Sequence, residues 1–197
     1  MAMITHGRRS QAGFTLVELL VVTAIFAIMS AVAMPRLAGA LENYRLGMAV
    51  RDVERELQAA RVSAVTANRT VRVLFNCPVA GQFRRVEVLG EPGLPDGRDD
   101  LASRCNPATF PYPAQDDNPL TRPNLDGPLR YLAQGITFGG SSGFEFRPDG
   151  TTRSDAFGGS ITWADIPVGG ITATLTKNTK TRSIAVNGMG RVFIIQP

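Results

Sequence analysis

One carboxylate in this sequence is placed where a charge is costly. Glu18 is the only charged residue between Phe14 and Met34, a stretch of 21 residues that is otherwise almost entirely apolar. An ionised carboxylate in hydrocarbon is expensive, so an acid in such a stretch usually has a function and a partner of opposite charge. The type and position of Glu18 therefore predict charge pairing within an apolar layer.

The remaining residues give little support for bond-breaking chemistry. His6 is the only histidine, and it lies in the short polar head before the apolar stretch. If that head is removed, no histidine is left for a Ser-His or Cys-His nucleophile or for a His-ligated metal site. Acid chemistry on paired carboxylates stays open, but no spacing singles out a pair. We expect no enzymatic activity, no catalytic residue, no metal and no cofactor.

The two cysteines are candidates for a cross-link. Cys77 and Cys105 lie 28 positions apart, and two thiols alone do not make a zinc site. In an oxidising compartment they can form one disulfide. Closing a loop of this size stabilises a fold by about 3–4 kcal/mol in the chain-entropy model. The alternative is two free, half-buried thiols, and we expect the disulfide if the domain is exported.

The N-terminal segment has the length and charge of a membrane anchor. A polar, basic head over residues 1–13 precedes an expected transmembrane helix over residues 14–35. Such a helix is about 30 Å long, enough to cross a bilayer core. The two arginines of the head favour a head in the cytoplasm and a C-terminal part outside it. The alternative is a secretory signal peptide cut after Ala33, which the length of the run and Glu18 disfavour.

The apolar pattern that follows predicts that the helix continues into a globular domain. One apolar series continues from the span and comprises Leu37, Leu41, Tyr44 and Met48. A second series comprises Leu46, Val50, Val53, Leu57, Ala60 and Ala64. At about 100° per residue the two series point to nearly opposite sides of a helix. We expect residues 36–68 to be amphipathic, with the second series buried in the domain core.

The remainder of the chain, residues 69–197, alternates in the manner of a β-rich domain. The expected strands lie within residues 70–77, 83–90, 135–140, 144–150, 160–164, 171–176, 182–188 and 190–196. Residues 91–129 hold eight of the 13 prolines, and we expect them to form a long surface insertion rather than a core element. The expected fold class is α+β, with one long N-terminal helix packed on an antiparallel β-rich domain.

The N-terminal residues "GFTLVELL", with Gly13, Phe14 and Glu18, resemble the cleavage signal of type IV prepilins and type II secretion pseudopilins. The resemblance implies that the prepilin peptidase cuts after Gly13 and methylates the new amino group of Phe14. A subunit that joins a bundle of such helices can then pair its amine with the Glu18 carboxylate of a neighbour. Pairing within one chain is the alternative, because positions 14 and 18 lie one turn apart. Pro35 stands where these helices often kink.

Later segments extend the resemblance. The stretches "LQAARVSAVTANRTVRVLF", "QGITFGGSSGFEFRPDGTT" and "VNGMGRVFI" are similar to the FimT/GspH-like minor pilins and pseudopilins. The resemblance implies a pilin-like fold and a structural subunit of a type IV pilus, acting in filament assembly initiation or at the tip. The alternative is the pseudopilin H of a type II secretion system, which shares the signal, helix and domain.

The same resemblance implies a location and partners. The chain would pass once through the bacterial inner membrane, with its globular domain in the periplasm, and then enter a pilus or pseudopilus. The prepilin peptidase and other pilins or pseudopilins would be its partners, the latter through the N-terminal helix.

A further function is DNA binding during natural transformation, because some FimT-like pilins bind DNA through a C-terminal Gly-Arg-x-Arg element. Here Phe193 replaces the second arginine. Lys177, Lys180, Arg182 and Arg191 are the candidate phosphate contacts, and solubilising charges at strand ends are the alternative. Without the two arginines of the head, 19 basic minus 17 acidic residues leave a net charge of +2. This charge is too small to predict a nucleic-acid partner, so we expect any DNA binding to be weak.

Overall fold

The computed structural model describes residues 14–88, 104–108, 110, 112, 125–155 and 163–195. The predicted leader, residues 1–13 with Gly13, and the acidic stretch 96–100 of the insertion lie outside these ranges. The chain divides into two compact units, Met1–Leu41 and Glu42–Pro197. One helix, α1 (Leu16–Ala67), continues from the first unit into the second and is 52 residues long.

Both ends of α1 are formed by local side-chain and backbone signals. At its start, the Thr15 hydroxyl oxygen accepts a hydrogen bond from the Glu18 N–H at 3.2 Å, which satisfies one of the unpaired donors of the first turn. At its end, Asn68 adopts a positive φ of 54°, and the Arg69 N–H donates to the Ala64 carbonyl at 3.1 Å. This is the hydrogen-bond pattern of a Schellman cap, with asparagine in the place that glycine usually takes.

In the second unit, α1 buries the side that the sequence predicts. All six members of the second apolar series are at most 2% exposed: Leu46, Val50, Val53, Leu57, Ala60 and Ala64. Tyr44, from the first series, is 66% exposed. The two series therefore lie on different sides of α1, as the periodicity predicts, because residues three and four apart lie on the same side of a helix.

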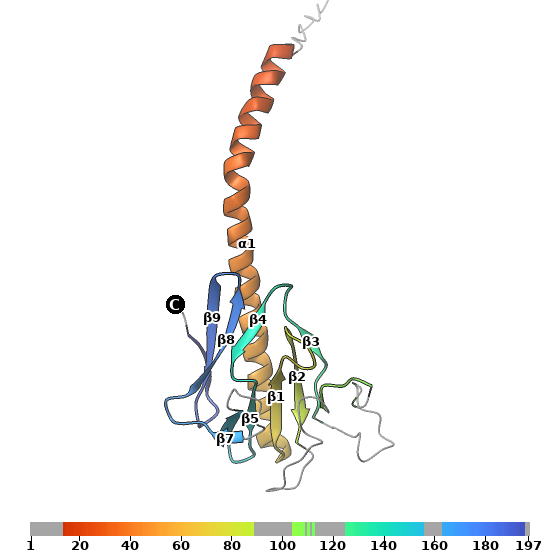
Figure 1. Ribbon diagram of the computed structural model, residues 1–197, viewed down its shortest axis with the longest axis vertical. Helices are drawn as coiled ribbons and strands as arrows, with labels where there is room; N and C mark the ends of the chain where they lie inside the picture. The colour runs from red at the N-terminus through yellow and green to blue at the C-terminus, as the bar shows by residue number, and fades with distance from the viewer. Residues whose placement is uncertain are drawn as a thin grey trace, which may run out of the picture. The chain divides into compact units, whose positions relative to one another are not determined.

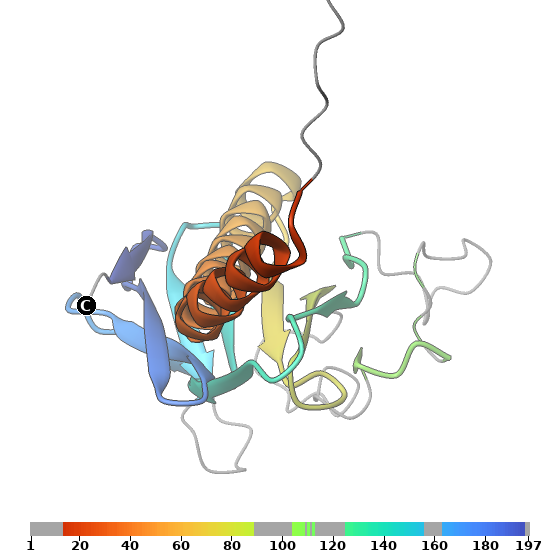
Figure 2. The ribbon, with the colours of Figure 1, turned by 90° about the horizontal axis from the view of Figure 1, so that it is seen from above.

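In the described residues of the second unit, ten strands form two antiparallel sheets, and Figure 1 shows how several of them are arranged. The six-stranded sheet has the order β3 (Arg130–Tyr131), β2 (Gln82–Glu87), β1 (Val71–Phe75), β5 (Gly143–Phe146), β6 (Thr152–Asp155), β7 (Trp163–Asp165). The four-stranded sheet has the order β10 (Val192–Ile195), β9 (Lys180–Val186), β8 (Ile171–Lys177), β4 (Thr137–Gly140). Figure 2 shows the strands of both sheets spread beside the C-terminal half of α1. The α+β fold class is thus confirmed.

Side chains from both sheets meet the buried side of α1 in one core. Val73 and Phe75 of β1, Phe144 of β5, and Ile184 of β9 are all completely buried there. The Phe75 ring stacks on that of Phe138, with 4.4 Å between their centroids. Burying a residue of this size contributes about 1.5–3 kcal/mol, so this core is the main reason that the second unit is compact.

Two ion pairs of one buried carboxylate also join α1 to the six-stranded sheet. Glu56 is 4% exposed although it is a carboxylate. It accepts a 2.7 Å hydrogen bond from Arg130 of β3 and lies 3.5 Å from the Arg85 guanidinium of β2. A buried carboxylate is tolerated when it is paired in this way, and removing one partner would be strongly destabilising.

The other side of the six-stranded sheet carries a smaller apolar cluster. Leu74 and Val86 pack there with Cys77 and Cys105, and Trp163 lies against them. Cys77 and Cys105 are joined in a disulfide, as the sequence predicts. The described part of the insertion therefore covers this side of the sheet.

The sequence predicts that residues 91–129 form a surface insertion rather than a core element, but part of the described segment is buried. Besides Cys105, the side chains of Arg104, Phe110 and Asp126 are buried, at 0%, 4% and 6% exposed. Charged residues are usually exposed, so the sequence predicts that Arg104 and Asp126 lie at the surface. Their burial depends on partners that are distant along the chain.

Two arginines and one aspartate hold this segment against β2. Arg104 donates to Asp126 at 2.6 Å and to the Glu87 backbone carbonyl at 2.8 Å. Arg84 of β2 lies 3.5 Å from Asp126 and donates to the Phe110 carbonyl at 2.8 Å. Burial raises the pKa of Asp126 to about 6, against the opposing effect of both arginines. The carboxylate is therefore ionised and paired at neutral pH.

Candidate functional site

The residues with the most specific chemical prediction lie at the start of α1. Phe14 precedes the helix and is 83% exposed, Thr15 caps it, and Glu18 lies in its first turn. The partner proposed for Glu18, a new amine on Phe14, would lie about one turn away in the same chain. The same amine on another chain is the other possible partner, because the Glu18 side chain is exposed.

The sequence "TLVE" also has a structural role at the start of the helix. Threonine at the cap and glutamate three residues later form the pattern of a capping box. In the structure the Thr15 half of this pattern is present as the hydrogen bond to the Glu18 N–H. Glu18 thus occupies a position where a negative charge also favours the helix, because the N-terminus of a helix dipole is positive.

The described part of the first unit, residues 14–41, exposes its large apolar side chains. In the described segment these side chains are 42–83% exposed, from Val22 at the lower limit to Phe14 at the upper. The most apolar 18-residue window has a mean hydropathy of 2.5, none of it is buried, and the helix is long enough to span a membrane. So much apolar surface on one chain requires a bilayer or other protein helices to cover it.

Pro35 lies inside α1, and the helix continues on both sides of it. A proline in a helix interior removes one backbone hydrogen bond and tends to bend the helix. A kink at Pro35 remains a prediction.

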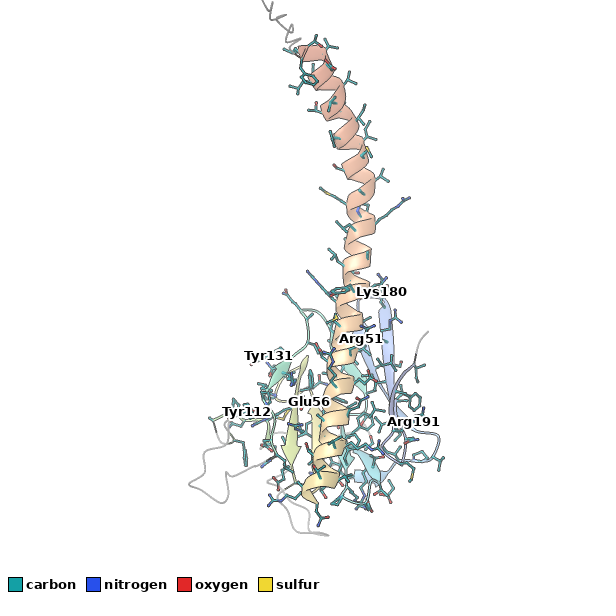
Figure 3. The ribbon with its side chains drawn as sticks, turned by 180° about the vertical axis from the view of Figure 1, so that it is seen from behind. Arg51, Glu56, Tyr112, Tyr131, Lys180 and Arg191 are labelled. Carbon is teal, nitrogen blue, oxygen red and sulfur yellow. A yellow bond between two sulfur atoms is a disulfide. The ribbon has the colours of Figure 1, made fainter. Side chains whose placement is uncertain are left out.

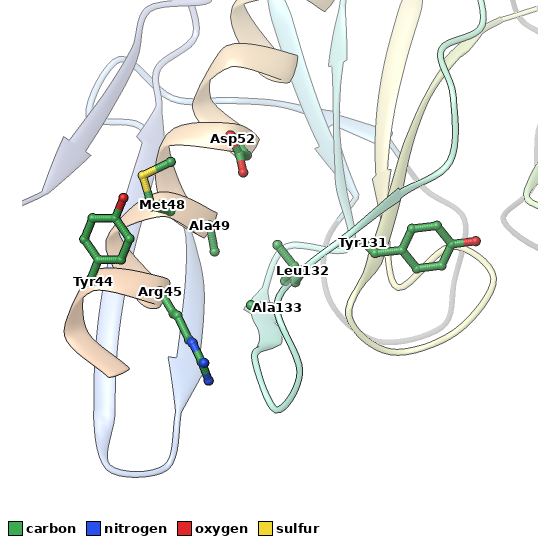
Figure 4. Close-up of a pocket in the computed structure, with 8 residues that line it drawn as sticks. All are labelled: Tyr44, Arg45, Met48, Ala49, Asp52, Tyr131, Leu132 and Ala133. Carbon is green, nitrogen blue, oxygen red and sulfur yellow. The ribbon is translucent and has the colours of Figure 1, made fainter. Parts of the chain in front are cut away.

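A shallow groove in the second unit lies next to the exposed side of α1. Tyr44, Arg45, Met48, Ala49 and Asp52 of the helix line it, together with Tyr131, Leu132 and Ala133 (Figure 4). Tyr44 and Tyr131 are 66% and 69% exposed. Aromatic residues, methionine and arginine are enriched in protein interfaces, but the groove contains no pair of groups that would form a catalytic site.

The four basic residues suggested for DNA contacts do not form one patch. Lys177 is only 9% exposed and donates to the Gln134 carbonyl at 3.0 Å. Lys180 begins β9 and lies 3.9 Å from Glu42 of α1. Arg191 follows the turn at the opposite end of β9 (Figure 3). Seven residues of strand separate the two ends by about 23 Å.

Comparison with known proteins supports the interpretation of the N-terminal segment. Residues 8–34 match a family model described as the prokaryotic N-terminal methylation motif. No curated protein matches the sequence.

Among solved structures, two crystal forms of the type IV minor pilin FimU from Pseudomonas aeruginosa strain PAO1 are similar to this chain. The first has a TM-score of 0.47 and 15% identity, and the match covers 79% of this chain and 91% of FimU. The second has a TM-score of 0.44 and 16% identity, over 77% of this chain and 93% of FimU. The chain thus carries a methylation motif at the start of a long apolar helix, and this helix continues into an antiparallel β-rich domain.

Proposed function

We propose that this chain is a minor pilin, a structural subunit of a type IV pilus that acts in filament assembly initiation or at the tip. The exposed apolar helix of the first unit is the observation that carries this proposal. A bilayer covers this surface before assembly, and the helices of neighbouring subunits cover it afterwards.

Cleavage of the leader prepares the apolar helix to leave the bilayer and pack against the helices of neighbouring subunits. The prepilin peptidase removes residues 1–13 on the cytoplasmic side, and the amine of Phe14 is methylated. The chain then spans the inner membrane once, with its globular domain in the periplasm. The Cys77–Cys105 disulfide is consistent with this location, because disulfides persist in oxidising compartments.

Charge pairing explains why Glu18 is tolerated in the apolar layer. An unpaired carboxylate and an unpaired amine are each costly in a low-dielectric surrounding, and each neutralises the other when subunits meet. The attraction acts only at the correct axial position of the incoming helix, so it selects the register of assembly. Pairing between chains therefore turns the cost of Glu18 into a driving force for addition to the filament.

Fractionation of cells that make the tagged full-length chain tests this function. We expect the processed chain in sheared pili, in small amounts relative to the main subunit. A cell lacking pilus genes but retaining type II secretion serves as the control. Recovery of the chain only with the type II secretion pseudopilus would assign it to the alternative machine and overturn the proposal.

A further inference from the structure

The last strand of the chain that the structure describes is an exposed sheet edge. β10 pairs with β9 on one side, and it stands at the end of the four-stranded sheet. Its sequence, "VFII", contains no charge, no glycine and no proline. Natural edge strands usually avoid this composition, because an uncharged edge with free backbone groups pairs readily with another strand.

The other three edges of the two sheets are protected in the usual ways. β3 is two residues long and carries Arg130, and β7 is three residues long and carries Asp165. β4 contains Gly139 and Gly140, and Gly140 has a positive φ of 86°. Short length, charge and irregular backbone each disfavour strand addition. Among the described edges, β10 is thus the one suited to accept a strand.

The hydrogen-bond register shows which backbone groups of β10 face outward. The Asn187 N–H donates to the Arg191 carbonyl at 3.1 Å, which makes these two residues a hydrogen-bonded pair. Hydrogen-bonded pairs alternate along an antiparallel ladder, so Phe193 and Ile195 direct their N–H and C=O groups toward β9. The N–H and C=O groups of Val192 and Ile194 consequently point away from the sheet.

The side chains of β10 complete an apolar docking surface. Val192 and Ile194 pack on the main core. Phe193 and Ile195 lie on the other side of the strand and are 38% and 41% exposed. A strand added at this edge would gain both backbone hydrogen bonds and cross-strand contacts with these two side chains.

We propose that β10 binds, by strand addition, an extended uncharged segment of a different subunit in the same filament. The segment must be uncharged where it faces Phe193 and Ile195, because a charge there would be desolvated without a counter-ion. The charged edges β3 and β7 of a second copy do not meet this requirement. The inference rests on the proposed function, from which it takes its partner.

Symmetric pairing of β10 with the β10 of a second copy conflicts with filament geometry. Antiparallel pairing of identical edges places a two-fold axis perpendicular to the sheet, which reverses every direction in the sheet plane. The part of α1 in the second unit lies lengthwise along β8 and β9 (Figure 1), so the two helices would run in opposite directions. Subunits of one filament carry their helices in the same direction.

Site-specific photocrosslinking in cells tests the proposal on the full-length chain. The photoreactive residue p-benzoyl-phenylalanine replaces Phe193, and the control carries it at Val168, which is 87% exposed in the turn before β8. We expect an adduct with a different filament subunit from position 193 and none from position 168. No adduct from position 193, equal adducts from both positions, or an adduct only with a second copy overturns the proposal.

Two variants test the role of the edge itself. Ile194→Pro removes an outward-facing N–H without touching the ladder with β9, and proline is tolerated at such edge positions. Ile195→Lys adds a charge to the edge, and Val168→Lys is its matched control. We expect each edge variant to lower the yield of the adduct from position 193 at least fivefold, while Cys77 and Cys105 stay unreactive to thiol reagents. An unchanged yield in both edge variants overturns strand addition.

The same samples separate this inference from the proposed function. A chain that is processed and present in sheared pili but gives no adduct from position 193 overturns strand addition alone. A chain that is absent from pili overturns both.

Discussion

At the scale of single residues, the proposed assembly chemistry rests on Glu18. Glutamine has the same size and also fits a capping box, so Glu18→Gln removes the charge without removing the helix start. We expect leader cleavage and membrane insertion to be unchanged and incorporation into filaments to fall at least tenfold, as measured by immunoblotting of sheared pili. Glu18→Asp is the control that keeps a charge. Normal incorporation of Glu18→Gln would show that the pair between chains contributes nothing.

Asp126 gives the second unit a defined dependence on pH. Its folded-state pKa of about 6 lies above the ordinary value of 3.8, so the folded state holds a proton that the unfolded state has lost between these values. The stabilisation by this proton is complete below the pKa that Asp126 has in the unfolded state. It is lost as the pH rises through the pKa that Asp126 has in the folded state. Over this window the free energy of unfolding is expected to fall by up to about 3 kcal/mol from this group.

Urea unfolding at several pH values, followed by the fluorescence of Trp163, measures this contribution. The matched control is Asp126→Asn, which cannot titrate. We expect the decline of stability between about pH 4 and 6 to be smaller in the variant than in the native chain. Equal slopes in both would contradict a raised pKa at this site.

These buried charged residues are also where prediction from sequence failed. The cysteine pair was predictable because cysteines are few and have specific chemistry. Arg104 and Asp126 look like ordinary loop residues, and their burial follows from contacts with β2 that no local pattern encodes. Thr15 could have been found, since threonine followed three residues later by glutamate is a recognised helix-start pattern.

At the scale of elements, the buried side of α1 is the main determinant of stability in the second unit. Leu57 is 0% exposed in the core, and Leu57→Ala is expected to lower the free energy of unfolding by about 2–5 kcal/mol. Val62 lies on the same helix but is 61% exposed, so Val62→Ala is expected to change it by less than about 0.5 kcal/mol. Urea titration of the purified chain in detergent compares them, and similar losses would contradict the assigned orientation of α1.

The helix was predictable because an apolar repeat of 3.6 residues extends over many turns. Most strands were predictable for the same reason with a repeat of two. β3 and β6 were not predicted. β6 (Thr152–Asp155) consists of polar residues, and its buried members are satisfied by distant groups, as when Thr152 donates to the Asn187 carbonyl at 2.6 Å. Residues of this kind usually mark turns, so tertiary contacts override the local preference here.

The arrangement of the C-terminal strands limits DNA binding. Of the four candidate residues, Lys177 and Lys180 already have protein partners, and Arg182 and Arg191 lie toward opposite ends of β9. Two phosphate contacts give a slope of log K against log salt no steeper than about −1.8. We expect gel-shift titrations at physiological salt to show no submicromolar binding. Submicromolar binding that is lost in Arg191→Ala would contradict this expectation and favour DNA uptake.

At the scale of the whole molecule, the chain combines an exposed apolar helix, which a bilayer or other helices must bury, with a domain that has its own hydrophobic core. Over residues 14–41, the described part of the first unit, no large apolar side chain is buried, whereas the second unit forms a continuous core around α1. Such a division is expected of a subunit that assembles through its helix and presents its domain outside the assembly.

The proposed cleavage after Gly13 predicts the mature N-terminus. We expect intact-mass measurement of the native chain to show a protein that begins at Phe14 and carries one methyl group. Removal of the apolar helix by a conventional signal peptidase would instead leave a terminus after Ala33. A chain of that mass would have lost its anchor, which contradicts both the processing and the assembly proposed here.

The cap at Thr15 has a consequence for proteolysis. Peptidases bind the bond that they cut in an extended conformation, and a helix that began earlier would withdraw that bond from them. Because Thr15 ends the helix on its N-terminal side, Phe14 stays outside α1. If the chain is processed as proposed, Thr15 keeps the cleaved bond outside the helix, and Glu18 acts only after cleavage, in assembly.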